Sequence, residues 1–156
     1  MQFRTLPTAY GITIVRVMAG VILIVASMEK FNGGGFEGFA KVAAGLSLPA
    51  PEALGVFTPL LEGIGGTLLL LGLGARWVAV LFVAEFFITS VILKTPRQPP
   101  FGGWDSMRID LMLLAASIAI ALVGPGAFAL ENQLGLSGLS VRPKPAPAPR
   151  GRPRAA

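Results

Sequence analysis

Four long runs of apolar residues dominate the chain, and each contains at least one ionisable residue. They extend over about 9–28, 53–73, 77–93 and 105–123. A hydrocarbon core about 30 Å thick requires roughly 20 residues of helix, and the four runs approach this length. The period-two alternation of a membrane β-strand is absent from the sequence, and backbone in lipid must satisfy its hydrogen bonds within a helix or a closed barrel. The pattern therefore predicts an all-α integral membrane protein, a four-helix bundle that occupies about residues 1–136.

Composition agrees with this prediction and restricts the chemistry. Of the 156 residues, 53% are hydrophobic and 13% charged, whereas a soluble domain carries roughly 25% charged residues. The sequence has no cysteine and no histidine, which excludes disulfides, thiol nucleophiles, iron–sulfur clusters, His-ligated haem and a Ser-His-Asp triad. We therefore expect no catalytic residue set, no metal site, and no cofactor bound covalently or through a metal ligand.

The segment between the first two runs has its own pattern. After the glycines of 33–35, apolar residues recur at helical spacing through about 36–46, with Glu37 and Lys41 between them. One interpretation is a short amphipathic helix on the bilayer surface. The other is a loop packed over the mouth of the bundle.

Orientation follows from the basic residues in the loops, which concentrate on the cytoplasmic side. If both termini are cytoplasmic, seven basic residues lie inside and four outside. The inner residues are Arg4, Arg76 and the five of the C-terminal tail, and the outer ones are Lys30, Lys41, Lys94 and Arg97. We therefore predict that both termini are cytoplasmic. The first run is expected to remain a membrane helix rather than a cleaved signal peptide, because Arg16 interrupts its apolar core.

The C-terminal segment 137–156 differs from the rest of the chain. It is rich in proline, alanine and arginine, it carries five basic residues and no acidic one, and it has no apolar run to bury. Such a segment is expected to be disordered. Without an aromatic or folded module beside it, the tail does not indicate nucleic acid. Attraction to anionic lipid headgroups, about 1 kcal/mol per basic residue, is the preferred interpretation.

Three ionisable residues interrupt the first three runs: Arg16, Glu62 and Glu85. Counted from the ends of the runs, all three fall near one depth, where ionisable groups normally face the bundle interior and find partners. We expect Arg16 to bridge both glutamates, or to pair with one while the other stays protonated. A protonated carboxyl there is a candidate proton carrier or a donor to a polar ligand head. The alternative is that these charges only fix helix packing.

A second group of ionisable residues lies toward the outer face. Lys30 ends the first run, and Asp110 begins the apolar part of the fourth. Asp110 precedes an apolar stretch and has a short side chain, so we expect it to point inward, toward Lys30.

Several short motifs occur in an order that resembles the DoxX family of small bacterial membrane proteins. Glu62 opens an E-x-x-G-G pattern at 62–66, and a G-L-x-x-R pattern follows at 72–76. The other matching features are Arg16, Lys30, the loop at 46–49, Asp110 and the Gly-Pro-Gly at 124–126. The resemblance covers about residues 15–130. One departure is at Ala26 and Ser27, where many relatives have a His-Gly pair, so a role for that histidine does not apply here.

The resemblance implies a multi-pass protein of the bacterial inner membrane with a respiratory or redox neighbourhood. Our first hypothesis is a non-catalytic accessory subunit of a quinone-linked redox complex, packed against a cofactor-bearing membrane subunit and able to help line a quinone site. A second hypothesis is a small carrier or binding protein for a lipid or hydrophobic metabolite. A third is a membrane assembly factor.

Overall fold

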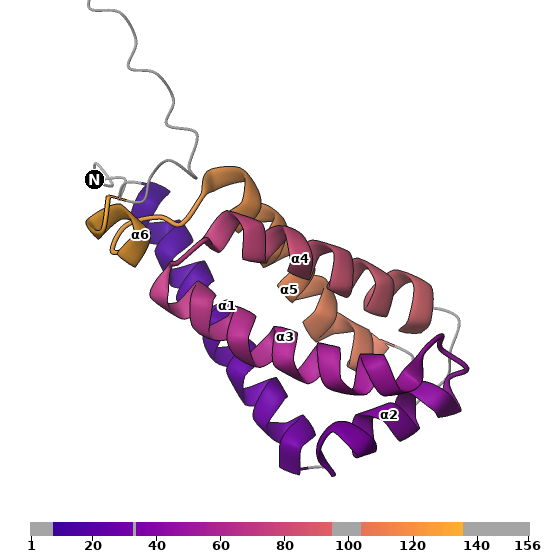
Figure 1. The fold of residues 1–156 in the computed structure, drawn as a ribbon. Coiled ribbons are helices and arrows are strands. Elements are labelled where there is room, and N and C mark those ends of the chain that lie inside the picture. The colour runs from indigo at the N-terminus through magenta and orange to yellow at the C-terminus, as the bar shows by residue number, and fades with distance from the viewer. Residues whose placement is uncertain (1–7, 33, 95–103, 136–156) are drawn as a thin grey trace, which may run out of the picture.

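The structure is a computed structural model that describes residues 8–32, 34–94 and 104–135. These residues are almost entirely helical and contain no strand. In chain order, the helices are α1 (Thr8–Asn32), α2 (Gly35–Gly45), α3 (Pro51–Leu71), α4 (Ala75–Phe87), the π-helix η1 (Ile88–Lys94), α5 (Trp104–Val123) and α6 (Leu130–Gln133) (Figure 1). The predicted all-α class is therefore confirmed. The tail at 137–156 lies outside the described residues.

Three of these helices are long and apolar enough to cross a membrane. They are α1, α3 and α4 with its continuation into η1, as far as Ile92. The structure thus agrees with the prediction of a membrane protein. A fourth crossing by α5, and the orientation of the termini, stay predictions.

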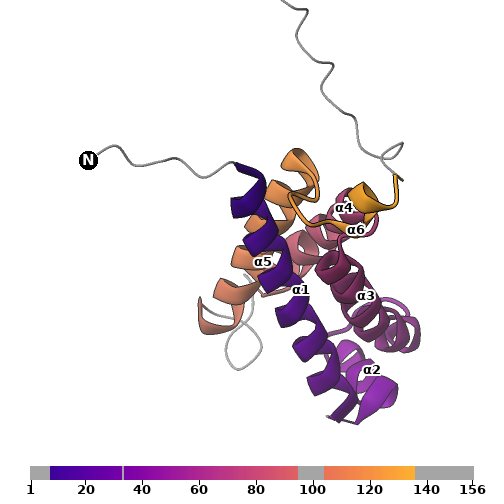
Figure 2. The same ribbon diagram turned by 90° about the vertical axis from the view of Figure 1, so that its left-hand side faces the viewer.

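The four long helices form a ring in which each contacts two others. α1 packs against α3 and α5, and α4 packs against the same two helices. Both views place α2 at the end of this bundle opposite to α6 (Figures 1 and 2). The bundle therefore has an α6 end, where α1 begins and α3 ends, and an α2 end, where α1 ends and α3 begins.

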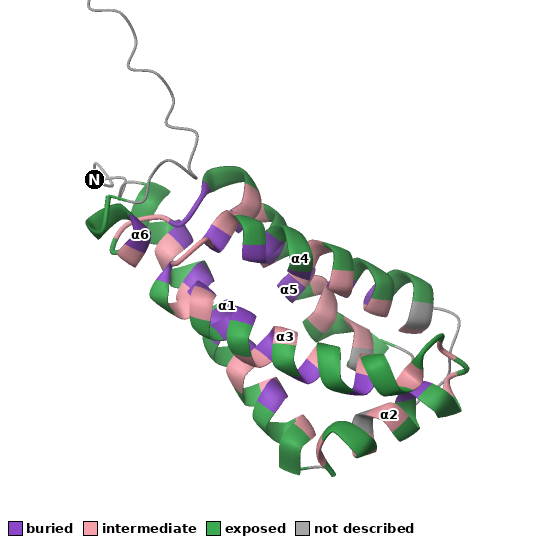
Figure 3. Ribbon diagram, viewed as in Figure 1, coloured by how far each residue is buried: buried purple, intermediate pink, exposed green. Residues whose placement is uncertain are grey.

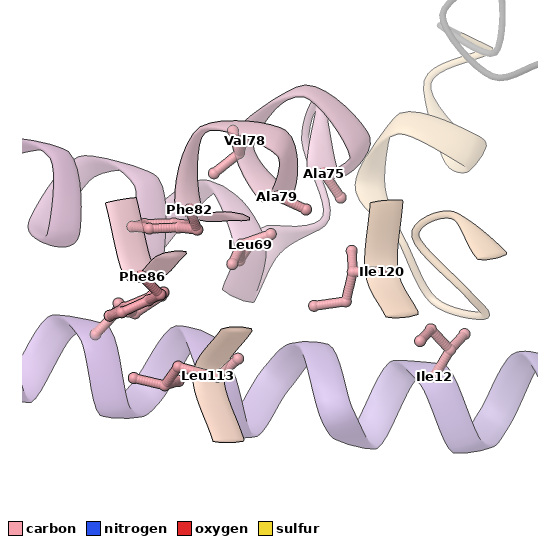
Figure 4. Close-up of a cluster of buried hydrophobic side chains, with 11 residues drawn as sticks. Ile12, Leu69, Ala75, Val78, Ala79, Phe82, Phe86, Leu113 and Ile120 are labelled. Atoms are coloured by element: carbon pink, nitrogen blue, oxygen red, sulfur yellow. The ribbon is translucent and has the colours of Figure 1, made fainter. Parts of the chain in front are cut away.

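Apolar side chains lie both inside and outside the bundle. Inside, side chains from all four long helices point toward one another, among them Ile12, Leu69, Phe82 and Ile120 (Figure 4). The outer faces are exposed (Figure 3), although they carry large apolar side chains such as Met112, which is 75% exposed. A soluble protein rarely exposes such extended apolar surface, whereas lipid requires it.

The close packing of α1 on α3 depends on glycine. A Cβ atom at Gly20 would lie 2.8 Å from the carbonyl oxygen of Gly66 and 2.9 Å from the backbone nitrogen of Leu70. Backbone atoms cannot move aside as a flexible side chain can, so only glycine permits this approach. Small residues at helix contacts are typical of membrane proteins.

We expect Gly20→Ala to lower the stability of the detergent-solubilised protein by about 1 to 3 kcal/mol, the usual cost of overpacking. Gly11→Ala is the matched control, because it lies on the same helix and a Cβ atom there would have no neighbour within 4 Å. Thermal unfolding of both variants checks this. Equal melting temperatures would contradict the α1–α3 contact.

The segment predicted at 36–46 is the helix α2, and it packs against α3 and the end of α1. A Cβ atom at Gly55 would lie 2.6 Å from the carbonyl oxygen of Phe36 and 2.7 Å from the Cβ atom of Ala40. The segment is thus a helix, as expected for the amphipathic-helix interpretation. It also packs over the end of the bundle, as expected for the loop interpretation.

Candidate binding site

A pocket of about 260 Å³ lies at the α2 end of the bundle. Residues of all the long helices, α2 and η1 contribute to it. Apolar residues and two threonines, Thr58 and Thr89, make up much of the lining. Five further lining residues are ionisable: Lys30, Glu62, Glu85, Lys94 and Asp110. The bundle therefore gathers a cluster of charges around one cavity.

The first pair in this cluster joins α1 to α3. Lys30 Nζ donates a hydrogen bond to Glu62 Oε2 over 2.5 Å. The side chain of Glu62 is 7% exposed and that of Lys30 is 23% exposed. Glu62 thus has its cationic partner at the end of α1, where the aliphatic stem of lysine can pass along apolar surface.

The second pair joins η1 to α5. Lys94 Nζ lies 2.8 Å from Asp110 Oδ2, and both side chains are mostly buried. Lys94 is the last residue of a seven-residue π-helix, a rare form that occurs frequently at functional sites. This wider turn follows α4 directly and contributes Thr89 and Lys94 to the pocket.

The fifth ionisable residue, Glu85 on α4, has an unsatisfied atom. Its Oε2 atom is buried and has no hydrogen-bond partner among the described residues. The charges of Glu62, Lys30 and Asp110 all act on it. Glu85 therefore offers the pocket a polar atom that the protein itself does not satisfy.

Arg16 lies elsewhere, and the predicted bridge from Arg16 to Glu62 and Glu85 is wrong. Its guanidinium is buried, and Nη1 donates to the carbonyl oxygens of Leu69, at 2.9 Å, and of Leu70, at 3.5 Å. These carbonyls belong to the last turn of α3, which lacks a full set of helical donors and carries the negative end of the helix dipole; Leu69 O also accepts from the backbone nitrogen of Gly72, at 3.1 Å. Arg16 therefore caps α3.

Helix geometry explains why the estimate of a common depth failed. Side chains on a helix lean toward its N-terminus, so the long Arg16 side chain extends toward the α6 end of the bundle. Its partner Leu69 is seven residues from Glu62, or about 10 Å along α3. Arg16 therefore lies at a different level from Glu62 and Glu85, which both line the pocket, and it is not in the pocket.

The charges of the outer group do come together, but their pairing differs from the prediction. Lys30 and Asp110 both line the pocket. Lys30 pairs with Glu62, and Asp110 pairs with Lys94. The prediction that Asp110 points toward Lys30 as its partner is therefore wrong.

Sequence reasoning missed two residues. Lys94 was counted only as a loop charge, although the predicted topology already placed it on the same side as Lys30 and Asp110. Glu131 on α6 is 4% exposed, and its charge acts on Arg16. Its backbone nitrogen donates to the carbonyl oxygen of Gly72 over 3.2 Å. No pattern in the sequence indicated that α6 returns to the end of α3.

The fold and the pocket define a small helical membrane protein with paired charges around an internal cavity. The chain belongs to the DoxX family, whose family model, described as DoxX, matches residues 11–95. It is 33% identical over 121 residues to "Putative oxidoreductase CatD" of Bacillus subtilis (strain 168), across 78% of this chain and 84% of that protein. It is 27% identical over 130 residues to "Inner membrane protein YphA" of Escherichia coli (strain K12), across 77% of this chain and 87% of that protein. No solved structure matches the chain.

Proposed function

We propose that this protein is a non-catalytic accessory subunit of a quinone-linked redox complex in the bacterial inner membrane, and that its pocket holds the polar head of a hydrophobic molecule. The pocket is the observation that carries the proposal. A cavity lined by apolar residues with a few convergent polar groups is typical of a small-molecule site. Ionisable groups inside a membrane protein also commonly mark functional sites.

A quinone is the first candidate for this molecule. The name of the Bacillus subtilis relative refers to an oxidoreductase, and that of the Escherichia coli relative to the inner membrane. A chain without cysteine or histidine lacks the side chains that hold iron–sulfur clusters and those that hold His- or Cys-ligated haem. Redox chemistry near this protein would therefore use a cofactor-bearing partner, while the pocket residues bind and orient a head group.

The size of the pocket favours a head group over a whole tailed molecule. At about 260 Å³ it lies just below the range of about 300 to 1,000 Å³ for sites that hold a drug-sized ligand. An apolar groove of about 560 Å³ lies between α3 and α4 and is lined by Leu61 and Leu81, among others. Leu81 is one helical turn from Glu85, so the two share a face of α4. This groove suits an apolar tail, and it also supports the second candidate function, a binding protein or carrier for a lipid or hydrophobic metabolite.

Purification of the full chain from its native membrane in mild detergent tests the proposal. We expect co-purifying cofactor-bearing subunits, together with a quinone in the organic extract. Thr58→Leu fills the pocket without removing a charge and should reduce the extracted quinone several-fold. Thr67→Leu, an exposed site on the same helix, is the matched control and should leave it unchanged.

Other outcomes of this purification would contradict the accessory-subunit role. A reproducible phospholipid or other lipid in the extract, reduced by Thr58→Leu, with no partner subunit, would favour the carrier. Partners present only in immature complexes would favour an assembly factor. An unchanged extract in Thr58→Leu would exclude the pocket as the binding site.

We further propose a multi-pass topology with both termini in the cytoplasm, so that the tail at 137–156 can contact anionic headgroups of the inner leaflet. The prediction is that a cysteine at Ser47 reacts with an impermeant thiol reagent added outside intact cells, while one at Ser137 does not. Ser47 is exposed in the turn after α2, and the chain has no other cysteine. Labelling of the cysteine at position 137 alone would indicate the opposite topology, and equal labelling of both cysteines would contradict the proposed one.

A further inference from the structure

The pocket contains one more acidic group than it has basic groups. Lys30 and Lys94 face three carboxylates, and two of these, Glu62 and Asp110, form the ion pairs. The third, Glu85, has its buried Oε2 atom without a hydrogen-bond partner. A buried polar atom left without a partner is costly, and more so when it is charged. Among the described lining residues, Glu85 is the one with a buried side-chain polar atom that has no hydrogen-bond partner.

We propose that Glu85 determines the specificity of the pocket, by selecting molecules whose polar head carries a hydroxyl group over those whose head only accepts hydrogen bonds. This inference rests on the proposed function, because it takes the pocket to be a head-group site. An ionised carboxylate only accepts hydrogen bonds, and a protonated carboxyl both donates and accepts. A hydroxyl group, which also does both, satisfies Glu85 in either state. A carbonyl head satisfies it only when Glu85 is protonated.

Three other polar groups of the pocket are engaged within the protein. The ammonium groups of Lys30 and Lys94 are donors and are held by carboxylates. Thr89 Oγ1, in η1, donates to the carbonyl oxygen of Phe86, in α4, at 3.4 Å. Glu85 Oε2 is the buried lining atom that has no hydrogen-bond partner among the described residues.

A quinone and its reduced form are a suitable pair of probes, because they share a skeleton and differ in carrying two carbonyl or two hydroxyl groups. We would measure the binding of decyl-ubiquinone and decyl-ubiquinol to the full chain in detergent, without oxygen, for three proteins. These are the wild type, Glu85→Gln, and Glu52→Gln as a control. Glu52 is exposed at the start of α3, so the control removes one carboxylate of the same helical bundle outside the pocket.

With Glu85 ionised in an alkaline buffer, the wild type should bind the quinol roughly ten- to hundredfold more tightly than the quinone, the range for one hydrogen bond to a charged group. Glu85→Gln should reduce the ratio to within about threefold, because an amide both donates and accepts. Glu52→Gln should keep the wild-type ratio. Melting temperatures of the three proteins show that the variants are folded.

Each failure has a separate meaning. Equal binding of both probes to the wild type would overturn the role of Glu85 and leave the proposed function standing. A preference that persists in folded Glu85→Gln, or loss of both probes in that variant, would also overturn it. If neither probe binds the wild type, a quinone head-group site itself is contradicted.

Discussion

Replacing Glu62 with leucine is expected to destabilise the protein by about 3 kcal/mol, the lower end of the range for breaking a buried ion pair. The reason is that the ammonium of Lys30 then loses the carboxylate 2.5 Å away. Because Lys30 is partly exposed, the expected loss of stability lies at the lower end of the range for buried ion pairs. When Lys30→Met is added, neither charge of this pair remains, and an apolar replacement of a whole pair can be close to neutral. The double variant should therefore be more stable than Glu62→Leu alone.

Thermal unfolding in detergent of the wild type, both single variants and the double variant gives the coupling energy. The pair of Asp105 and Arg108 is the matched control, because it is an ion pair at 3.2 Å with mostly exposed side chains. Surface pairs of this kind contribute about 0 to 1 kcal/mol. A coupling energy between Lys30 and Glu62 no larger than that of the surface pair would contradict the claim that they form a stabilising buried ion pair.

Arg16→Leu is expected to cost a similar amount, about 3 kcal/mol, for a different reason. The carbonyls of Leu69 and Leu70 lose the guanidinium donor at the end of α3, so that Leu69 O keeps only the backbone nitrogen of Gly72, and the buried carboxylate of Glu131 loses the cation that acts on it. Adding Glu131→Gln should restore part of the loss, because the remaining buried charge is removed.

Arg108→Leu, an arginine with a mostly exposed side chain, is the control and should change stability by less than about 0.5 kcal/mol. Arg16→Leu and Glu62→Leu should be additive within about 0.5 kcal/mol, as for sites without contact. An Arg16→Leu variant as stable as Arg108→Leu would exclude the capping role. Strong coupling of Arg16 to Glu62 would restore the originally expected bridge.

Local periodicity was sufficient to predict the four long helices and α2. The four apolar runs and the short segment at 36–46 all correspond to helices of the structure, since each depends on the spacing of apolar residues along one stretch of chain. The presence of glycines at helix contacts, as at Gly20 and Gly66, was also visible, because small residues have few other uses in membrane helices.

The partners of the charged residues could not be predicted in the same way. Pairing depends on which helices neighbour each other and on the direction in which each side chain leans. Arg16 leans toward the end of α3 rather than toward Glu62, and Lys30 reaches Glu62 from the end of α1. The π-helix that carries Lys94 changes the helical register locally, and a 3.6-residue pattern does not report such a change.

The claim that the pocket at the α2 end binds the head of a hydrophobic molecule is tested most directly by photocrosslinking with an azido-quinone in native membranes. After digestion, mass spectrometry should locate the label in α3 near Thr58 and Glu62 and in α4 or η1 near Glu85 and Thr89. Thr58→Leu should remove this label, and Thr67→Leu should not. Label found only on outward apolar residues such as Ile14 and Met112, or label in α3 and α4 that Thr58→Leu leaves unchanged, would contradict the account.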